Sequence, residues 1–195
     1  MCHTALFEGN GMKLFIKRSV KEYVIYAAVT VIGIILDQLT KLLAALYLKG
    51  GDAVTVIPGV VQLRYVENRG AAFGMLDNAP WIFNTVSIIA IAAMVAFLFS
   101  GHAESKLSGI ALSMMISGGI GNMIDRIRFR YVVDMIYLDM FDFTGINTIF
   151  NGADSFVCIG AGLLILALIL EMKEEIKREK SKKEMTANVE NEDKE

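Results

Sequence analysis

The longest uncharged stretch of this sequence constrains its fold more than any other feature. Twenty-six consecutive residues, Asn78 to Ala103, contain no aspartate, glutamate, lysine or arginine. A helix of about 20 apolar residues spans the hydrocarbon core of a bilayer. Across all 195 residues, 54% are hydrophobic and 21% are charged, a balance that water-soluble domains seldom show. We therefore expect a membrane protein.

Four stretches have the length and the composition of membrane spans. We expect all four to be helices, because a helix satisfies its own backbone hydrogen bonds inside lipid. They cover residues 23–41, 79–99, 107–124 and 153–170. The sequence predicts an all-α polytopic membrane protein with one domain over residues 23–170, flanked by an N-terminal arm (1–22) and a charged tail (171–195). The tail contains 16 of the 40 charged residues, and we expect a frayed helix there that ends in disorder.

Lysine and arginine counts predict the orientation of the chain. Four spans place both termini on one side, and the arm, the 101–106 turn and the tail together contain 12 lysines and arginines, against seven on the opposite side, counted over residues 41–69 and 126–130. The positive-inside rule therefore favours cytoplasmic termini. The two outer segments, 42–78 and 125–152, are much longer than the inner turn. We therefore expect any chemistry on the extracytoplasmic side.

The first outer segment has the pattern of two paired strands. Residues 54–57 and 61–66 flank Pro58-Gly59, and the second run alternates apolar with polar side chains. This pattern predicts a hairpin or a small sheet. The hairpin is either a structural lid or an edge that holds an extended peptide by strand addition, and the pattern alone does not decide between them.

Polar residues near the ends of the spans form the next group of candidates. Asp37 and Lys41 lie four residues apart on one helical face, which allows an ion pair across one turn. That pair either stabilises the end of the span or takes part in chemistry, since ionisable groups at membrane depth are often functional. Asn122, Asp125 and Arg126 share one face at the end of the third span, and we expect them to brace a neighbouring group.

Small residues also follow one face of the third span. Ser113, Ser117 and Gly121 recur every four residues, and Gly118 and Gly119 remove further bulk beside them. This spacing predicts that the backbone packs closely against a neighbouring helix.

Two acids in the later outer segment are candidates for catalysis. Asp134 lies in an apolar segment, residues 131–136, where burial would raise the proton affinity of its carboxyl group. Asn151 can cap the fourth span, and Asp154 then occupies the third helical position, where free N–H groups favour an ionised carboxylate. Capping alone is one account of Asp154. The other is an aspartic-protease dyad, in which an ionised acid activates water and a protonated acid donates to the substrate carbonyl.

Other chemistries find few suitable residues in this chain. The two histidines, His3 and His102, are not near another candidate catalytic side chain in the sequence, so the sequence does not favour a Ser-His-Asp arrangement. Cys2 and Cys158 do not have the spacing of a disulfide framework or a zinc site. The net charge of −2 does not support nucleic-acid binding. We expect neither a metal nor a cofactor.

Two further functions stay open from the residues alone. A metal-dependent phosphatidyl transferase would use carboxylates beside the membrane, because magnesium prefers oxygen ligands, but its usual Asp-Gly opening pair is missing. A small transporter or channel would use Asp37 and Asp125 in an ion path, but the middles of the spans are apolar. The acids that the transferase would use are Asp125, Asp134, Asp139 and Asp142.

Five sequence blocks together resemble one known family. They are Asp37-Gln38-Leu39-Thr40-Lys41, Asn68-Arg69-Gly70-Ala71-Ala72-Phe73, Gly121-Asn122-Met123-Ile124-Asp125-Arg126, Val132-Val133-Asp134 and Phe150-Asn151-Gly152-Ala153-Asp154-Ser155. In this order they resemble the lipoprotein signal peptidases, the signal peptidase II family. The blocks extend over residues 37–155, and the joint match is specific although each block alone would be weak.

The resemblance implies a four-helix membrane aspartic protease with Asp134 and Asp154 as its dyad. Such an enzyme removes the signal peptide from bacterial prolipoproteins, next to a cysteine that carries diacylglycerol, so its partners are these precursors and the lipids of the cytoplasmic (inner) membrane. The family also has an extracytoplasmic cradle of strands with a short helix, which corresponds to about residues 50–78. The residues expected to line or brace the site are Asp37, Asn68, Gly70, Ala71, Phe73, Asn122, Asp125, Arg126, Asn151 and Ala153.

Overall fold

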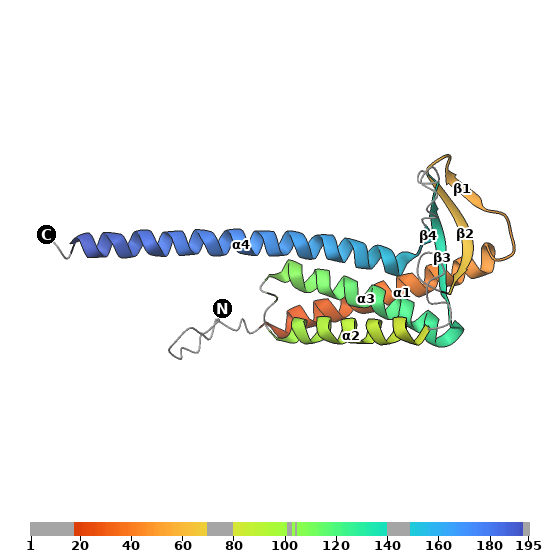
Figure 1. Cartoon of the computed structure of the whole chain (residues 1–195), viewed down its shortest axis with the longest axis horizontal. Coiled ribbons are helices and arrows are strands. Elements are labelled where there is room, and N and C mark those ends of the chain that lie inside the picture. Colours follow the sequence, from red (N-terminus) through yellow and green to blue (C-terminus); the bar gives the residue numbers. More distant parts are fainter. Residues whose placement is uncertain (1–17, 70–79, 101–102, 104, 140–148, 193–195) are drawn as a thin grey trace.

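Four helices and four strands make up the part of the chain that the computed structural model describes, which is residues 18–69, 80–100, 103, 105–139 and 149–192 (Figure 1). The helices are α1 (Val20–Tyr47), α2 (Pro80–Phe99), α3 (Lys106–Phe129) and α4 (Gly152–Glu192). The strands are β1 (Val54–Ile57), β2 (Val61–Asn68), β3 (Val132–Leu138) and β4 (Ile149–Phe150). The helices run along a common axis, and the sheet lies across one end of the bundle (Figure 1). Helix α1 begins and α4 ends at the opposite end.

The helices have the apolar character that a bilayer requires. Within the described residues, α1, α3 and the Gly152–Ser181 part of α4 are long and apolar enough to cross a membrane, and α2 has a shorter apolar stretch, Asn84–Phe99. Many large apolar side chains of α1 point outward and are exposed, as lipid-facing residues are. The predicted spans are confirmed as apolar helices at α1, α3 and α4, while a complete fourth span at α2 stays a prediction.

The expected small sheet beside the helices is confirmed, and it contains four antiparallel strands. Strands β1 and β2 confirm the hairpin, and its turn places Gly59 at a φ of 67°, a conformation that glycine adopts without strain. Strand β3 pairs with β2, and β4 pairs with β3, giving the order β1-β2-β3-β4. The pattern of residues 131–136 did not indicate a strand, because most of β3 is buried on both faces and therefore lacks alternation.

Helix α1 continues to Tyr47, six residues beyond the predicted end at residue 41. The additional turns pack against the sheet, where Ala44 forms a buried apolar cluster with Val133 and Met135 of β3. Burial of apolar surface against another element stabilises helical turns that local propensity does not specify. The sheet is thereby attached to the side of α1.

Helix α4 is one continuous helix to Glu192, so the expected helix in the tail is present and continues further than predicted, while residues 193–195 lie outside the described residues. Opposite charges lie four residues apart along it, for example Glu174 with Arg178 and Glu179 with Lys183, and such pairs support a solvated helix. The helix extends well past the other three (Figure 1).

Helix α3 is the central helix and contacts α1, α2 and α4. The small residues that the sequence singled out make these contacts close, because Ser113 and Ser117 are fully buried and a methyl group at Gly118 would overlap the carbonyl oxygen of Ala153 on α4. A methyl group at Gly121 would likewise collide with the carboxylate of Asp37 on α1. The predicted close packing of this face is confirmed.

We predict that Gly118→Ala destabilises the protein by about 1–3 kcal/mol, the usual cost of overpacking, because the start of α4 must move away from α3. The matched control is Gly162→Ala, since nothing lies within 4 Å of a methyl group there and alanine favours the helix by up to about 1 kcal/mol. Thermal unfolding in detergent measures both variants. A Gly118→Ala protein as stable as the control would contradict this packing.

Candidate active site

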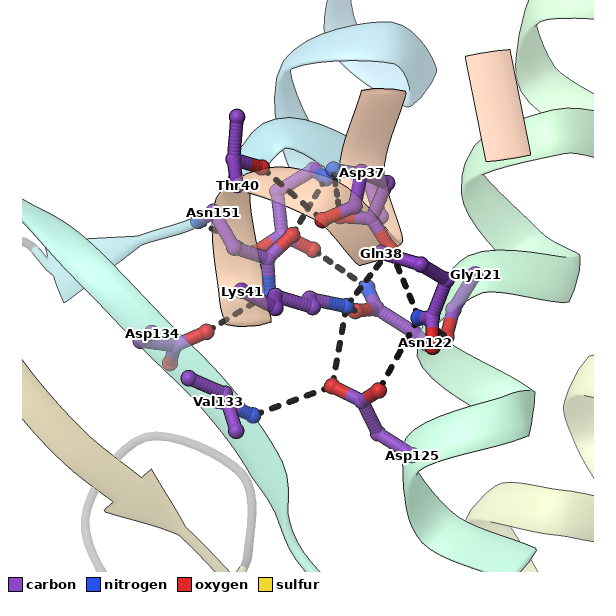
Figure 2. A network of polar contacts seen from close by, with 12 residues as sticks. Asp37, Gln38, Thr40, Lys41, Gly121, Asn122, Asp125, Val133, Asp134 and Asn151 are labelled. Atoms are coloured by element: carbon purple, nitrogen blue, oxygen red, sulfur yellow. Dashed lines mark hydrogen bonds and ion pairs between the residues drawn. The ribbon is translucent and has the colours of Figure 1, made fainter. Parts of the chain in front are cut away.

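A network of buried polar side chains occupies the sheet end of the bundle, where residues of α1, α3, β3 and the segment before α4 converge (Figure 2). The protein interior tolerates such groups only when their hydrogen bonds are made. Here the network joins the start of α4 and strand β3 to the second half of α1 and the last two turns of α3. Its members are Asp37, Gln38 and Lys41 of α1, Asn68 of β2, Asn122 and Asp125 of α3, Asp134 of β3, and Asn151 and Asp154 at the start of α4.

Asn151 and Asp154 form a reciprocal cap at the start of α4. The backbone N–H of Asp154 donates to Oδ1 of Asn151 at 3.0 Å, and the backbone N–H of Asn151 donates to Oδ2 of Asp154 at 3.2 Å. The predicted cap is therefore confirmed. It uses only one carboxylate oxygen, and Nδ2 of Asn122 donates to the other, Oδ1, at 2.8 Å. Asp154 is only half-buried, so the cap leaves it accessible.

Asp134 lies on β3 and is only 1% exposed. Its two oxygens accept hydrogen bonds from Nδ2 of Asn151 at 2.7 Å and from Nδ2 of Asn68 at 2.8 Å. Burial raises the pKa of Asp134 from 3.8 to about 6; the two amide hydrogen bonds oppose this shift, and the nearby charge of Asp154 adds to it. The expectation of a desolvated carboxyl group with raised proton affinity is confirmed.

Asn151 contacts both acids, and this brings them together. Its side-chain nitrogen donates to Asp134, while its side-chain oxygen and backbone N–H bind Asp154. Because the backbone N–H of Asp154 must meet an oxygen, the amide nitrogen of Asn151 has to point toward Asp134. Asp134 and Asp154 are thus held by one buried residue, in two different environments.

Lys41 forms the centre of the network on the α1 side. Its Nζ lies 2.9 Å from Oδ2 of Asp37 and 3.0 Å from Oδ2 of Asp125, and it donates to Oδ1 of Asn122 at 2.9 Å. The predicted pair of Asp37 with Lys41 is confirmed, but it is part of a larger cluster. Gln38 joins the same cluster by donating to both carboxylates.

The two carboxylates of this cluster also hold the backbone beside each candidate acid. Oδ1 of Asp37 accepts the backbone N–H of Ala153 at 2.8 Å, one residue before Asp154. Oδ2 of Asp125 accepts the backbone N–H of Val133 at 3.1 Å, one residue before Asp134. The ends of α1 and α3 therefore position both acids through equivalent contacts to the preceding residue.

The remaining expected site residues differ in what the structure shows of them. Arg126 is partly buried and interacts electrostatically with Asp154, Asp125 and Asp134, which fits the expected brace. Gly70, Ala71 and Phe73 lie outside the described residues.

Lys41, Gln38 and the backbone of Val133 were not among the expected site residues, although the sequence contains one signal for Lys41. A lysine four residues after an aspartate, inside an apolar helix, is a costly group that needs partners. The interaction of Asp125 with Val133 has no such signal, because it depends on how β3 packs.

The acids proposed for metal or ion chemistry do not converge on one point. Asp125 is paired with Lys41, and Asp139 accepts a hydrogen bond from Gln62 on the sheet; Asp142 lies outside the described residues. A cavity of about 240 Å³ lies between α1, α3 and the sheet and reaches Lys41 and Asp125, but neither Asp134 nor Asp154 lines it.

Comparison with known proteins agrees with this architecture. The family profile described as Signal peptidase (SPase) II matches residues 29–170, more than half of the chain. The chain belongs to the signal peptidase II family. It is therefore a peptidase of a bacterial membrane family, in keeping with its apolar helices. The matched range includes both candidate acids and the whole polar network.

Individual relatives match over most of their length. A lipoprotein signal peptidase of Clostridium tetani is 43% identical over 146 residues, which cover 73% of this chain and 91% of the relative. One from Streptococcus pyogenes serotype M2 is 41% identical and covers 68% of this chain and 85% of the relative. A solved structure described as a bacterial membrane enzyme, determined by the in meso method at 2.3 Å resolution, has a TM-score of 0.68 at 34% identity and covers 77% of this chain and 90% of its own.

The environment of Asp134 predicts a pH-dependent stability. Because its pKa is about 6 in the folded protein against 3.8 ordinarily, the folded state binds this proton more tightly than the unfolded chain does. Stability should therefore fall as the pH rises from about 4 to about 6, by about 3 kcal/mol at most. Thermal midpoints of the parent and of Asp134→Asn across this range measure the contribution, since the variant lacks it. Identical pH slopes in the two proteins would contradict the raised pKa.

Proposed function

We propose that this chain is an aspartic endopeptidase that removes the signal peptide from bacterial prolipoproteins whose cysteine already carries diacylglycerol. The observation that supports this most directly is that Asn151 forms hydrogen bonds with both Asp134 and Asp154 at one end of a membrane-spanning bundle. The names of the relatives supply the class of substrate, because they are lipoprotein signal peptidases. The reaction requires no cofactor in this proposal.

The two acids have the unequal environments that a dyad needs. Asp134, with its pKa raised to about 6, holds the shared proton, and Asp154, with a donor on each oxygen, is the ionised partner. Their protons come off as a coupled pair. Separate environments of this kind let one carboxyl group act as base and the other as acid.

The reaction then proceeds in two proton-transfer steps. Asp154 takes a proton from a water molecule, whose oxygen attacks the carbonyl carbon of the scissile peptide bond, while Asp134 donates its proton to the carbonyl oxygen. The tetrahedral intermediate collapses as Asp154 gives its proton to the leaving nitrogen and Asp134 recovers a proton from the hydroxyl. Hydrolysis by this route uses the two carboxyl groups alone.

The remaining parts of the chain are assigned roles around this centre. Both termini lie in the cytoplasm, the four helices span the cytoplasmic membrane, and the sheet end faces the extracytoplasmic side, where precursors arrive. In this proposal the 50–78 segment acts as the cradle over the substrate, and Gly70, Ala71 and Phe73 contribute to substrate binding. The residues that line or brace the dyad are Asp37, Asn68, Asn122, Asp125, Arg126, Asn151 and Ala153.

The central test replaces each acid by its amide. We expect Asp134→Asn and Asp154→Asn to lower kcat on the order of 10³-fold, because each removes a proton-transfer group. The assay uses purified protein in detergent with a diacylglyceryl-modified precursor. The control is Asp52→Asn, an exposed acid outside the network, which should retain parental activity. Activity in both amide variants, or loss of activity on adding a metal chelator, would overturn the proposal.

The pH profile gives a second test of which acid holds the proton. In the free enzyme kcat/KM should fall as the pH rises through about 6, where Asp134 loses its proton. The hydrogen bond from Asn68 lowers the pKa of Asp134, so Asn68→Ala should move this basic limb to higher pH. A limb that moves to lower pH, or stays in place, would assign the proton elsewhere.

A further inference from the structure

We propose that Lys41 is a positioning residue for the reaction, because its ammonium group orients the Asn122 amide and so provides a hydrogen-bond donor to Asp154. This inference rests on the proposed function, in which Asp154 reacts in its ionised form. The sequence offered two accounts of Lys41, a stabilising ion pair with Asp37 or a part in the chemistry. The contacts of its three N–H groups favour the second account.

Each of the three N–H groups of the Lys41 ammonium has an acceptor. The side chain has three donors and no acceptor, and three acceptors lie within 3.0 Å of Nζ: Asp37, Asp125 and Asn122. Lys41 is only 3% exposed. Two carboxylates compensate the positive charge, and the third proton is therefore directed at the amide of Asn122 (Figure 2).

This third contact decides which way the Asn122 amide faces. Because Lys41 can only donate, the amide atom next to it has to be the oxygen, and Nδ2 of Asn151 donates to that same oxygen at 3.1 Å. The other amide atom is then the nitrogen, which donates to Oδ1 of Asp154 at 2.8 Å. A reversed amide would present an oxygen to the carboxylate and would repel it.

The donor from Asn122 fixes the direction in which Oδ1 of Asp154 points. The other charged groups around this carboxylate are Asp134 on β3 and Arg126 on α3, with Asp37 and Asp125 behind Lys41. Lys41 shows no direct bond to Asp154 and acts through Asn122. It thereby links the charge cluster of α1 and α3 to the acid on α4.

The test separates this role from simple charge compensation. Replacing Lys41 alone would leave two buried carboxylates without a counter-charge, which destabilises a protein strongly. We therefore compare the parent with the double variant Lys41→Met/Asp125→Asn, which keeps the parental net charge of the cluster, and use Asp125→Asn to measure the effect of the lost carboxylate alone. In Asp125→Asn the amide oxygen can still accept from both Lys41 and Val133, since both bind the same oxygen, Oδ2, in the parent.

We expect the double variant to lose more activity than Asp125→Asn, in the chemical step and not in substrate binding. Its kcat should fall about ten- to a hundred-fold with little change in KM, because a charge-assisted hydrogen bond is lost and no substrate contact is. A kcat equal to that of Asp125→Asn, with only a lower thermal midpoint, would show that Lys41 is a stabilising ion pair and would overturn the proposal.

A second variant keeps the proposal testable if the double variant does not fold. Asn122→Asp retains an oxygen for Lys41 but replaces the nitrogen that faces Asp154 by another oxygen, so it should also lower kcat about ten- to a hundred-fold with little change in KM. Parental kcat in a folded Asn122→Asp protein would overturn the proposal as well. Failure of the proposed function is distinguishable, because cleavage by Asp134→Asn and Asp154→Asn would then persist whatever the kcat of the Lys41 variants.

Discussion

One buried positive charge holds the functional end of this molecule together. The ammonium group of Lys41 lies between the carboxylates of Asp37 and Asp125, and each carboxylate also accepts a backbone N–H, from Ala153 and from Val133. Burial of three charges is costly unless their geometry is good and their remaining hydrogen bonds are made, and here both conditions are met. Helices α1 and α3 are thereby joined to α4 and to β3 at the residues next to Asp154 and Asp134.

In the proposed mechanism, the same atoms at the start of α4 serve both structure and chemistry. A helix N-terminus has free N–H groups that need acceptors, and Asn151, Asp154 and Asp37 supply them. The two oxygens of Asp154 have different partners. Oδ2 accepts the backbone N–H of Asn151 and so completes the cap, while Oδ1 accepts a hydrogen bond from Asn122. Capping and catalysis are therefore not alternatives for this residue, because the cap fixes the direction in which the second oxygen points.

Local features of this protein could be predicted from the sequence, and features that depend on packing could not. The cap of Asn151 with Asp154 and the pair of Asp37 with Lys41 involve residues three or four apart, so helical geometry determines them. The addition of Asp125 to that pair depends on how closely α1 approaches α3. Strand β3 was missed because its burial on both faces removes the alternation that marks a strand. Motif spacing placed the acids in one family, but only the fold shows that Asn151 joins them.

The shared use of the first turn of α4 limits how this chain can change in length. One residue inserted between Asn151 and Asp154 would rotate everything after it by about 100° around the helix axis. The carboxylate would leave both Asn122 and the cap, and the face of α4 that packs against Gly118 would turn away with it. Residues 172–181 of α4, beyond the other helices, are exposed. Insertions and deletions should therefore be tolerated after the bundle ends and rejected at the end that holds the two acids.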